Sequence, residues 1–478
     1  MSRNSVWTKS LPRATDVSYL QIDRGALSMG WSRFARANRS LRTEEWGIGR
    51  QGGLRARLWS MTPPLLQQTS FRRFWTAQTI SYFGDQITFV ALPLTAVLAL
   101  HANAAQVGLL SAAGSLPSLI FALHAGAFVD QFGRRRKMMI LADLLRAALL
   151  LTVPITYWLG QLTIQHLYIV AFLTGSLAVV FGICANSLFV ALVPRDDFVR
   201  GNSLVKGSYY LSWVAGPTAG GALIQAVSGP ISILCDVVSF IGSALLLRSI
   251  SPEEPPRIKA GRGHLSEGFL FIRRASALLA KFFIDASLNF FYTIYFTLLF
   301  LFAAKELRLS ALAIGLVLAA GAVGAVVGSA LTTRVSLRIG VGPAFLVGSF
   351  IYPGALVLAP IAGGPQWLAA GLLVIAEFTS GVGLMICDIS GSSIQQALTP
   401  DRLRGRVQGA FMLFNNGFRP FGALLGGALG TWLGLRPTLW VASIGGVLSV
   451  MLILPSSIRR MRTLPEEADF PVVDSADA

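Results

Sequence analysis

The sequence of 478 residues is dominated by apolar stretches of about 20 residues, each separated from the next by a short polar segment. A stretch of this length and composition can cross the hydrocarbon core of a bilayer as a helix. Only 13% of the residues are charged, which is about half the share in a soluble domain. The composition therefore excludes an ordinary cytosolic enzyme, and we expect an all-α membrane protein.

The apolar pattern predicts twelve transmembrane helices. They lie at 75–100, 106–129, 138–159, 165–190, 203–227, 230–248, 278–303, 311–331, 341–361, 366–388, 407–433 and 436–455. With the first 73 residues left out, 22 Lys and Arg lie in or beside the even-numbered gaps and the C-terminal tail, and 3 lie in or beside the odd-numbered gaps. Because basic segments stay on the cytoplasmic side during insertion, we expect a multi-pass protein of the cell (inner or plasma) membrane with both termini in the cytoplasm.

The chain contains an internal repeat at an offset of 206 residues: Gly216 and Gly220 recur as Gly422 and Gly426. The fifth span therefore corresponds to the eleventh, and the twelve helices form two pseudo-symmetric six-helix bundles. Two repeated halves are typical of a carrier that binds its substrate between them and opens alternately to each side. The predicted division is a basic tail at 1–70, a first bundle at 71–248, a cytoplasmic linker at 249–277, a second bundle at 278–455 and a cytoplasmic tail at 456–478.

The net charge of +17 is explained by topology rather than by a nucleic-acid partner. Residues 1–60 carry 11 basic and 4 acidic side chains but no apolar helix, which is typical of neither a signal peptide nor a folded domain. Two interpretations stay open: a disordered basic tail, or a true start at Met61. The remaining excess lies mostly in the short gaps between spans, so we expect no nucleic-acid binding.

The sequence favours transport over catalysis. Its three cysteines lie far apart inside apolar runs, which predicts buried free thiols rather than a metal motif. We find no nucleophile elbow, H-E-x-x-H motif or phosphate-binding loop. We therefore expect no enzymatic activity, no cofactor and no metal.

Several ionisable side chains fall inside the predicted spans. They are Asp85, His124, Asp143, Arg146, Asp236, Asp285, Glu377, Asp388 and Arg419. An ionisable group at this depth costs several kcal/mol unless it is paired or hydrated, so each is a candidate functional residue. Asp143 and Arg146 lie one helical turn apart, which predicts a structural intramembrane ion pair near the cytoplasmic face.

The candidates for binding protons or substrate are Asp85, Glu377 and Asp285, together with Asn289. Asp85 is the acid of the first span and lies about midway along it, whereas Glu377 lies deep in the tenth span. Asp285 and Asn289 share one face of the seventh span. The aromatic residues that follow them suit either a large apolar substrate or the surrounding lipid.

The loop after the second span resembles the signature G-x-L-A-D-R-x-G-R-K of the major facilitator superfamily. It contains Gly126, Asp130, Gly133, Arg134 and Arg135 at the matching positions, with Phe in place of the usual Leu and Gln in place of the Arg that follows the Asp. The resemblance implies that Asp130 acts in a gate by contacting the start of the eleventh helix, where unpaired backbone N–H groups and nearby arginines favour an anion. The alternative is a solvated charge that only sets topology.

The fifth span contains Gly216, Pro217, Gly220 and Gly221, which resemble the G-P-x-x-G-G signature of exporters in this superfamily. Small residues at this spacing allow helices to approach closely in lipid. We expect a seam between the halves, with the small-residue stripe that ends at Gly328 on the eighth span as its partner; ordinary helix packing is the alternative.

The resemblance covers about residues 70–455 and is similar to the bacterial efflux branch, which includes macrolide and siderophore exporters. It implies a monomeric secondary transporter in the lipid bilayer that exports a hydrophobic or amphipathic small molecule, a drug or natural product, in exchange for protons. A siderophore exporter, a lipid flippase and a membrane scaffold that transports nothing are the alternatives. Many drug–proton antiporters carry an Arg in the middle of the fourth span, and this chain has none there.

Overall fold

The computed structural model describes residues 64–121, 134–194, 197–250, 265–400, 403–453 and 456–463. Every regular element in these ranges is helical, and none is a strand. The chain from Pro64 onward groups into one compact unit. The predicted basic tail lies mostly outside the described residues.

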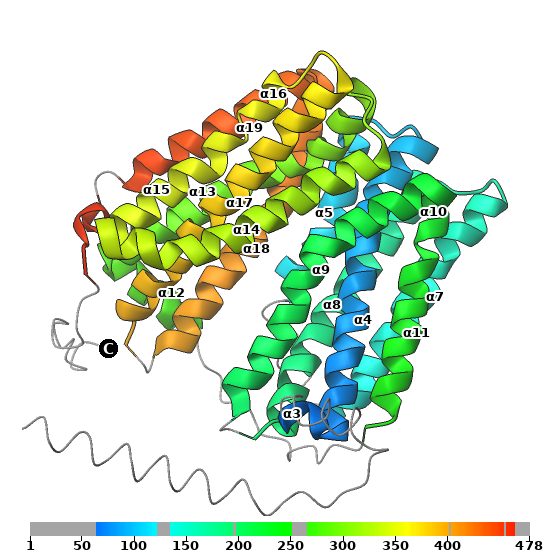
Figure 1. Ribbon diagram of the computed structural model, residues 1–478, viewed down its shortest axis with the longest axis horizontal. Helices are drawn as coiled ribbons and strands as arrows, with labels where there is room; N and C mark the ends of the chain where they lie inside the picture. The colour runs from blue at the N-terminus through cyan, green and yellow to red at the C-terminus, as the bar shows by residue number, and fades with distance from the viewer. Residues whose placement is uncertain are drawn as a thin grey trace, which may run out of the picture. The chain divides into compact units, whose positions relative to one another are not determined.

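The first half contains six long helical segments, drawn from blue to green in Figure 1. They are α4 (Thr69–Leu94) with the π-helical turn η1 (Thr95–Ala99), α5 (Ala104–Phe121), α7 (Arg135–Trp158), α8 (Ile164–Leu192), α9 (Phe198–Val227), and α11 (Leu234–Arg248) preceded by the short α10 (Gly229–Ser232). The one-turn helix α3 (Pro64–Gln67) comes before them.

The second half repeats this order. Its segments are α13 (Ser276–Leu301) with the π-helical turn η3 (Phe302–Glu306), α14 (Ala311–Ile339), α15 (Val341–Ala355) with α16 (Leu358–Ile361), α17 (Gln366–Ala397), α18 (Arg404–Trp432), and α19 (Leu435–Ser449) with η5 (Val450–Ile453). The amphipathic helix α12 (Leu265–Arg274) precedes α13, and the short η6 (Ser457–Arg460) follows the last segment.

Ten of the helices in the described ranges are long and apolar enough to cross a membrane. The two long helices outside that set are α9 and α18, with 30 and 29 residues. They are less apolar because they carry basic residues in their first turns and Gly-rich stretches farther along. The all-α membrane fold is therefore confirmed, and membrane crossing by α9 and α18 stays a prediction.

The helices of the two halves pack in the same pattern. Within the first half α4 packs against α9 and α11, and within the second half α13 packs against α18 and α19. The halves join where α5 packs against α18 and where α14 packs against α9. Even the turns repeat, because His101 and Arg308 each follow a π-helical turn and both have a φ of 51°. The predicted repeat is therefore present in the structure.

The Gly-rich motif of α9 makes two kinds of close contact. Gly216 and Gly220 face α4 of the same half, at Gln86 and Ile87. Gly221 faces α14 of the other half, and a Cβ atom there would lie only 2.4 Å from the carbonyl oxygen of an alanine at the start of α14. The motif therefore packs one helix against its own bundle and against the opposite bundle at once.

The prediction that the small-residue stripe of α14 ending at Gly328 is the partner of this motif was wrong. Gly324 and Gly328 of α14 face backbone atoms of α17 inside the second half. The true partners are Ala311 and Gly315, which lie about two and a half to three and a half turns before Gly324 on α14. The spacing of small residues identified a close-packing helix correctly, but two faces of α14 carry such residues and sequence does not say which neighbour each face meets.

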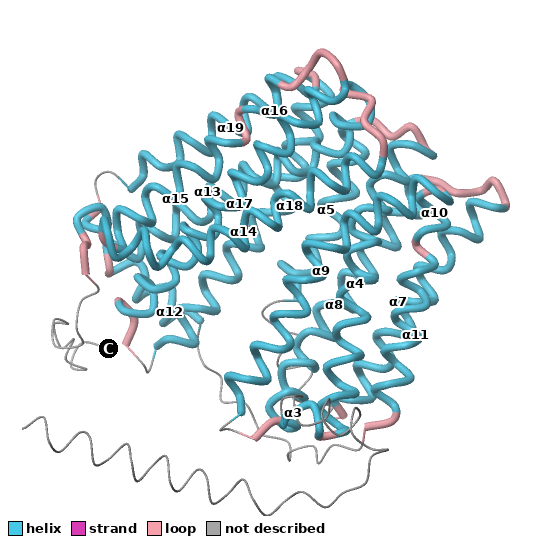
Figure 2. The backbone as a smooth tube through the Cα atoms, in the orientation of Figure 1, coloured by secondary structure: helices cyan, strands magenta, loops and turns pink. Residues whose placement is uncertain are grey.

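The halves are hydrogen-bonded at one end. The Lys305 ammonium donates to the Ala102 carbonyl at 2.7 Å, the Ala105 amide donates to Thr431 Oγ1 at 2.9 Å, and the Leu312 amide donates to a glutamine of α9 at 3.3 Å. Toward the opposite end the helices of the two halves diverge (Figure 2). In the predicted topology the bonded end faces outward.

We expect this topology to be measurable with a reporter that is active only outside the cytoplasm. Alkaline phosphatase fused after Gly160, in the turn that follows α7, should be active, and the same enzyme fused after Ser249 should be inactive. An inactive Gly160 fusion at normal protein level would contradict the orientation.

We also expect Gly221→Ala to destabilise the contact between α9 and α14, because its methyl group would force the two backbones apart. Overpacking of this kind costs about 1–3 kcal/mol. The matched control is Gly207→Ala on the same helix, where a Cβ atom meets no heavy atom within 4 Å. Thermal unfolding of the purified proteins should show a lower midpoint for Gly221→Ala alone, and equal midpoints would refute the contact.

Candidate functional site

An ion pair joins α4 and α7 inside the first half. The Arg146 guanidinium binds the Asp85 carboxylate, and it also lies over the ring of Phe240 on α11, 4.0 Å from the ring centroid. The Arg146 side chain is 7% exposed, whereas that of Asp85 is 37% exposed. The pair therefore couples a buried cation to a carboxylate that is only partly covered by other protein atoms.

The predicted pair of Asp143 with Arg146 was wrong. Both carboxylate oxygens of Asp143 are buried, and within the described residues they accept no hydrogen bond of regular geometry, although Ser243 of α11 lies close by. The i,i+3 spacing on α7 made the pair plausible. It gave no information about an acid supplied by another helix, and Asp85 of α4 takes the guanidinium instead.

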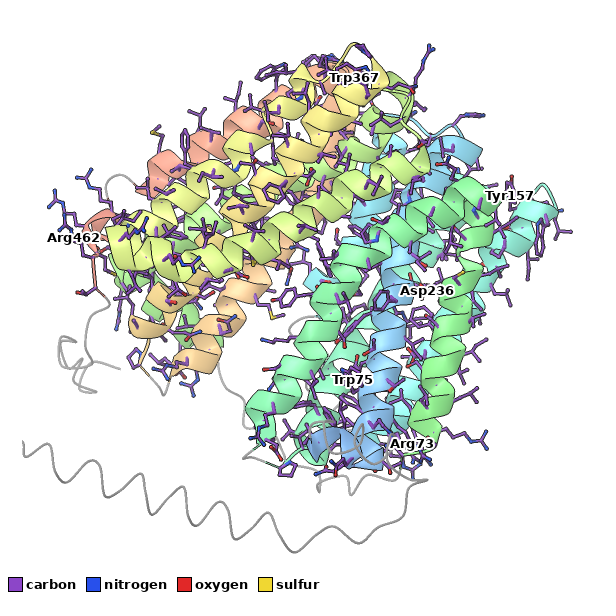
Figure 3. All side chains as sticks on the ribbon, in the orientation of Figure 1. Arg73, Trp75, Tyr157, Asp236, Trp367 and Arg462 are labelled. Atoms are coloured by element: carbon purple, nitrogen blue, oxygen red, sulfur yellow. The ribbon has the colours of Figure 1, made fainter. Side chains whose placement is uncertain are left out.

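A third carboxyl group, Asp236, completes this cluster. It is fully buried on α11 (Figure 3) and accepts hydrogen bonds from Thr88 at 2.5 Å and from Ser239 at 2.8 Å. Gly84 makes room for it, because a Cβ atom there would lie 2.2 Å from the Asp236 carboxylate. We call Asp85, Asp143, Asp236 and Arg146 the first-half acidic cluster.

The cluster holds three carboxyl groups for one guanidinium. If all three were ionised, two negative charges would lie at bilayer depth without a cation, and each unpaired charge would cost several kcal/mol. The arrangement is therefore most stable with protons on some of its carboxyl groups. It can store a proton and change which carboxylate Arg146 binds.

Glu377 is enclosed within the second half. Its side chain is 5% exposed and accepts a hydrogen bond from the Tyr295 hydroxyl of α13 at 2.9 Å. Gly321 of α14 lies against it, since a Cβ atom there would be 3.2 Å from the carboxylate. In this conformation the Glu377 carboxylate is enclosed by its neighbours and shielded from solvent.

Asp285 and Asn289 lie on α13 as predicted, but in different roles. Asp285 binds the ammonium of Lys281 on the same helix, so its charge is neutralised locally. Asn289 donates to the Asp285 backbone carbonyl at 2.9 Å, and its amide oxygen lies 3.5 Å from the Arg419 guanidinium of α18. Asn289 is therefore the member of this pair that contacts an exposed charge.

The two halves carry different chemistry at equivalent positions. Asp85 and Arg146 correspond to Tyr292 and Tyr352, which lie 207 and 206 residues later. The two tyrosine rings are 5.4 Å apart. An ion pair in the first half is thus replaced by an aromatic pair in the second.

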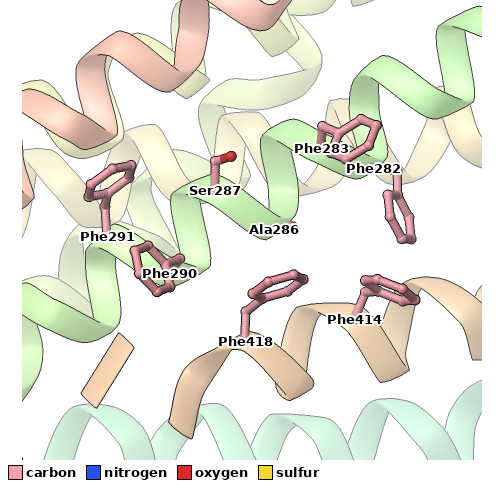
Figure 4. A pocket seen from close by; sticks show the side chains of 8 residues that line it. All are labelled: Phe282, Phe283, Ala286, Ser287, Phe290, Phe291, Phe414 and Phe418. Carbon is pink, nitrogen blue, oxygen red and sulfur yellow. The ribbon is translucent and has the colours of Figure 1, made fainter. Parts of the chain in front are cut away.

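A pocket of about 230 Å³ lies between α13 and α18 (Figure 4). Its wall consists mostly of phenylalanine rings from the two helices. The lining residues are Phe282, Phe283, Ala286, Ser287, Phe290, Phe291, Phe414 and Phe418. Aromatic residues of the seventh span thus do form an apolar hollow, and its lining carries no ionisable group.

Of the predicted gate motif, Gly126, Asp130 and Gly133 lie outside the described residues. Arg134 immediately precedes α7, and Arg135 is its first residue. The neighbouring side chains bind the end of α11: Arg136 donates to the carbonyl of Ile250, and Arg73 donates to that of Ser249 at 2.5 Å. Cations suit this position because the last carbonyls of a helix are unpaired and partly negative.

The arginines at the start of α18 were predicted to face Asp130. In this structure Arg406 forms an ion pair with Glu267 of α12, and Gly268 packs against the Arg406 backbone. Helix α12 is thus bound to the end of α18 that the gate would use.

Sequence reasoning named all four members of the first-half acidic cluster but missed how they combine, and it did not single out Lys281, the partner of Asp285. Presence in apolar spans was the signal for Arg146, Asp236 and Arg419. Within the described residues, no three His, Cys, Asp or Glu side chains are grouped so that they could hold a metal ion.

Comparisons with known proteins agree with this architecture. The multidrug efflux pump Tap of Mycobacterium tuberculosis (strain ATCC 25618 / H37Rv) is 27% identical over 405 residues, which cover 81% of this chain and 93% of that protein. The enterobactin exporter EntS of Salmonella typhi is 25% identical over 423 residues, which cover 86% of this chain and 98% of that protein.

Among solved structures, a bacterial homologue of the iron transporter ferroportin in its inward-facing state is similar, with a TM-score of 0.65 and 17% identity over 80% of this chain and 98% of that chain. The outward-facing state of a bacterial ferroportin homologue gives a TM-score of 0.53 with 16% identity over the same shares. The sequence profile of the Major Facilitator Superfamily matches residues 74–419. With this match over most of its length and the fold described above, the chain belongs to the Major Facilitator Superfamily of membrane transporters.

Proposed function

We propose that this transporter exports a hydrophobic or amphipathic small molecule across the cell membrane in exchange for protons. Its relatives named as a multidrug efflux pump and an enterobactin exporter support export. The two repeated halves support alternating access, in which substrate binds between them. The protein works as a monomer with both termini in the cytoplasm.

The first-half acidic cluster carries the proposal of proton exchange. Asp85 is its water-accessible member, and it gives up Arg146 when it takes a proton. Arg146 then binds Asp143, one turn away on its own helix, because a freed guanidinium at bilayer depth needs a new anion. Asp143 pairs as a carboxylate and the proton stays on Asp85 until the halves open to the cytoplasm, so the cation never stays unpaired.

The Arg expected on the fourth span is absent from this chain, and Arg146 supplies a cation in its place. The superfamily's drug–proton antiporters commonly carry it on the fourth span, whereas this chain carries it on the third. Because α7 packs against α11, which packs against α4, Arg146 still reaches the acid of the first span. Proton exchange in this chain therefore does not require an Arg on α8.

The conformation supports alternating access. The hydrogen bonds at the predicted outer end hold the halves together there, and the helices diverge toward the other end. The higher TM-score with the inward-facing ferroportin homologue than with the outward-facing one favours the same stage of the cycle. Protons would then leave Asp85 toward the cytoplasm.

Glu377 serves as a second proton-binding residue in this proposal. Its hydrogen bond from Tyr295 links α17 to α13, so a change in its protonation alters a contact between two helices of the second half. Glu377 could contact a cationic substrate only after Tyr295 moves away from its carboxylate.

We expect Asp85→Asn to abolish export that is driven by a pH gradient, because the amide cannot carry a proton. Everted membrane vesicles with an acidic lumen would be given three dansyl probes: dansylglycine, dansylcadaverine and dansylamide. Probe uptake should collapse to the level without a gradient in the variant. The matched control is Asp197→Asn, which removes a carboxylate from a surface pair with Arg200.

A second experiment tests the charge balance of the first-half acidic cluster by measuring thermal stability. Arg146→Met leaves its carboxyl groups without a cation, and such changes cost about 3–5 kcal/mol. Adding Asp85→Asn should restore much of the lost thermal stability, without restoring transport. Full gradient-driven uptake by Asp85→Asn would place the proton site elsewhere and make Asp285 the next candidate.

The gate motif is part of the same proposal, with Asp130 latching the halves by contacting α18 in the outward-facing stage. Asp130→Asn should leave the protein level unchanged and reduce vesicle uptake of the dansyl probes to a small fraction. Normal uptake by this variant would show that Asp130 only sets topology.

A further inference from the structure

Arg419 places an exposed positive charge near the middle of α18. It lies about 22 Å from the first residue of the helix at a rise of 1.5 Å per residue. Its side chain is exposed, and its hydrogen-bond partner is the Asn289 amide oxygen at 3.5 Å. Within the described residues no carboxylate forms an ion pair with it.

The acids that could neutralise this charge are engaged elsewhere. Asp85 binds Arg146, and Asp285 binds Lys281. Glu377 is buried behind the hydroxyl of Tyr295. Arg419 therefore keeps a net positive charge. Because an unpaired guanidinium at this depth is energetically costly, a residue of this kind is typically part of a binding site.

The Arg419 guanidinium faces the region where the two halves meet. Tyr209 of α9 in the first half lies within its electrostatic range. Tyr292 of α13 in the second half does so as well.

A continuous set of aromatic rings runs from one half to the other beside this charge. Ring centroids are 6.1 Å apart for Tyr209 and Trp213, and 6.3 Å apart for Trp213 and Phe89. Phe89 stacks on Phe296 of the second half at 5.4 Å, and Phe296 lies 5.6 Å from Tyr292. Trp213 and Phe89 are 41% and 40% exposed, so flat ring surface is available for stacking.

We propose that Arg419 and Asn289 bind the acidic group of an aromatic substrate, and that these rings bind its planar body. The proposal rests on the export function and specifies its substrate class as an aromatic organic anion. An arginine suits this role because its planar fork can donate two parallel hydrogen bonds to a carboxylate or sulfonate. An inside-negative membrane potential also favours the outward movement of an anion.

Binding of the three dansyl probes tests this assignment, because they share one naphthalene ring and differ in charge. The purified full-length transporter would be placed in phosphatidylcholine nanodiscs, with empty nanodiscs as background. Wild type should bind dansylglycine at least about tenfold more tightly than dansylcadaverine, with dansylamide between them. This ranking is measured on the wild-type protein alone, so it tests the proposal even if a substitution prevents folding.

Arg419→Gln should weaken dansylglycine binding by about ten- to a hundredfold, the size expected for a lost charged hydrogen bond, and leave dansylamide binding nearly unchanged. Arg419→Lys should keep most of the preference. The matched control is Arg338→Gln, which removes an exposed arginine from the far end of α14.

Equal binding of dansylglycine by wild type and Arg419→Gln would overturn the proposal, and so would a preference for dansylcadaverine. Displacement of dansylglycine by phosphatidylglycerol in the nanodisc would overturn it by assigning the site to a lipid headgroup. Failure of the export function is distinguishable, because under a pH gradient wild-type vesicles would then take up dansylglycine and dansylamide no faster than vesicles that lack the transporter.

Discussion

A charge at bilayer depth must have a partner, and this constraint organises the interior of both halves. Arg146 has Asp85, and Lys281 has Asp285 together with the ring of Phe411, 4.7 Å from its ammonium group. Each of these two pairs is formed within one half, either between neighbouring helices or within one helix. The transporter can therefore move its halves relative to each other without breaking a buried ion pair.

The contact between the halves depends on a different interaction. Apolar side chains gain little from leaving lipid for a helix surface, so association relies on close packing of small residues. Gly108 and Gly315 supply such contacts at equivalent places: a Cβ atom at either would lie within 2.7 Å of a carbonyl oxygen of α18 or α9. Contacts of this kind carry no charge or directional side-chain bond, which lets a seam close and separate repeatedly.

Sequence patterns predicted the helices, the repeat and the identity of the intramembrane charges, because these depend on spacing along one chain. They did not predict which acid meets Arg146 or which face of α14 meets α9. Asp143 was the nearer acid in sequence, but the closer carboxylate belongs to α4, and only the crossing of α4, α7 and α11 reveals it. Glu377 was correctly placed deep in its span, whereas its enclosure by Tyr295 and Gly321 depends on two other helices.

The two halves share one arrangement of helices but differ in chemistry at equivalent positions. Where the first half places Asp85 and Arg146, the second half places two tyrosines, so the pseudo-symmetric framework holds ionisable chemistry on one side and aromatic surface on the other. The exposed charge of the second half, Arg419, lies beside that aromatic surface and not among the carboxyl groups. The framework thus duplicates its helices while the chemistry of these equivalent positions differs between the halves. Tyr209 of α9 lies within electrostatic range of both Asp85 and Arg419, so the ion pair of the first half and the exposed charge of the second half lie near one common residue.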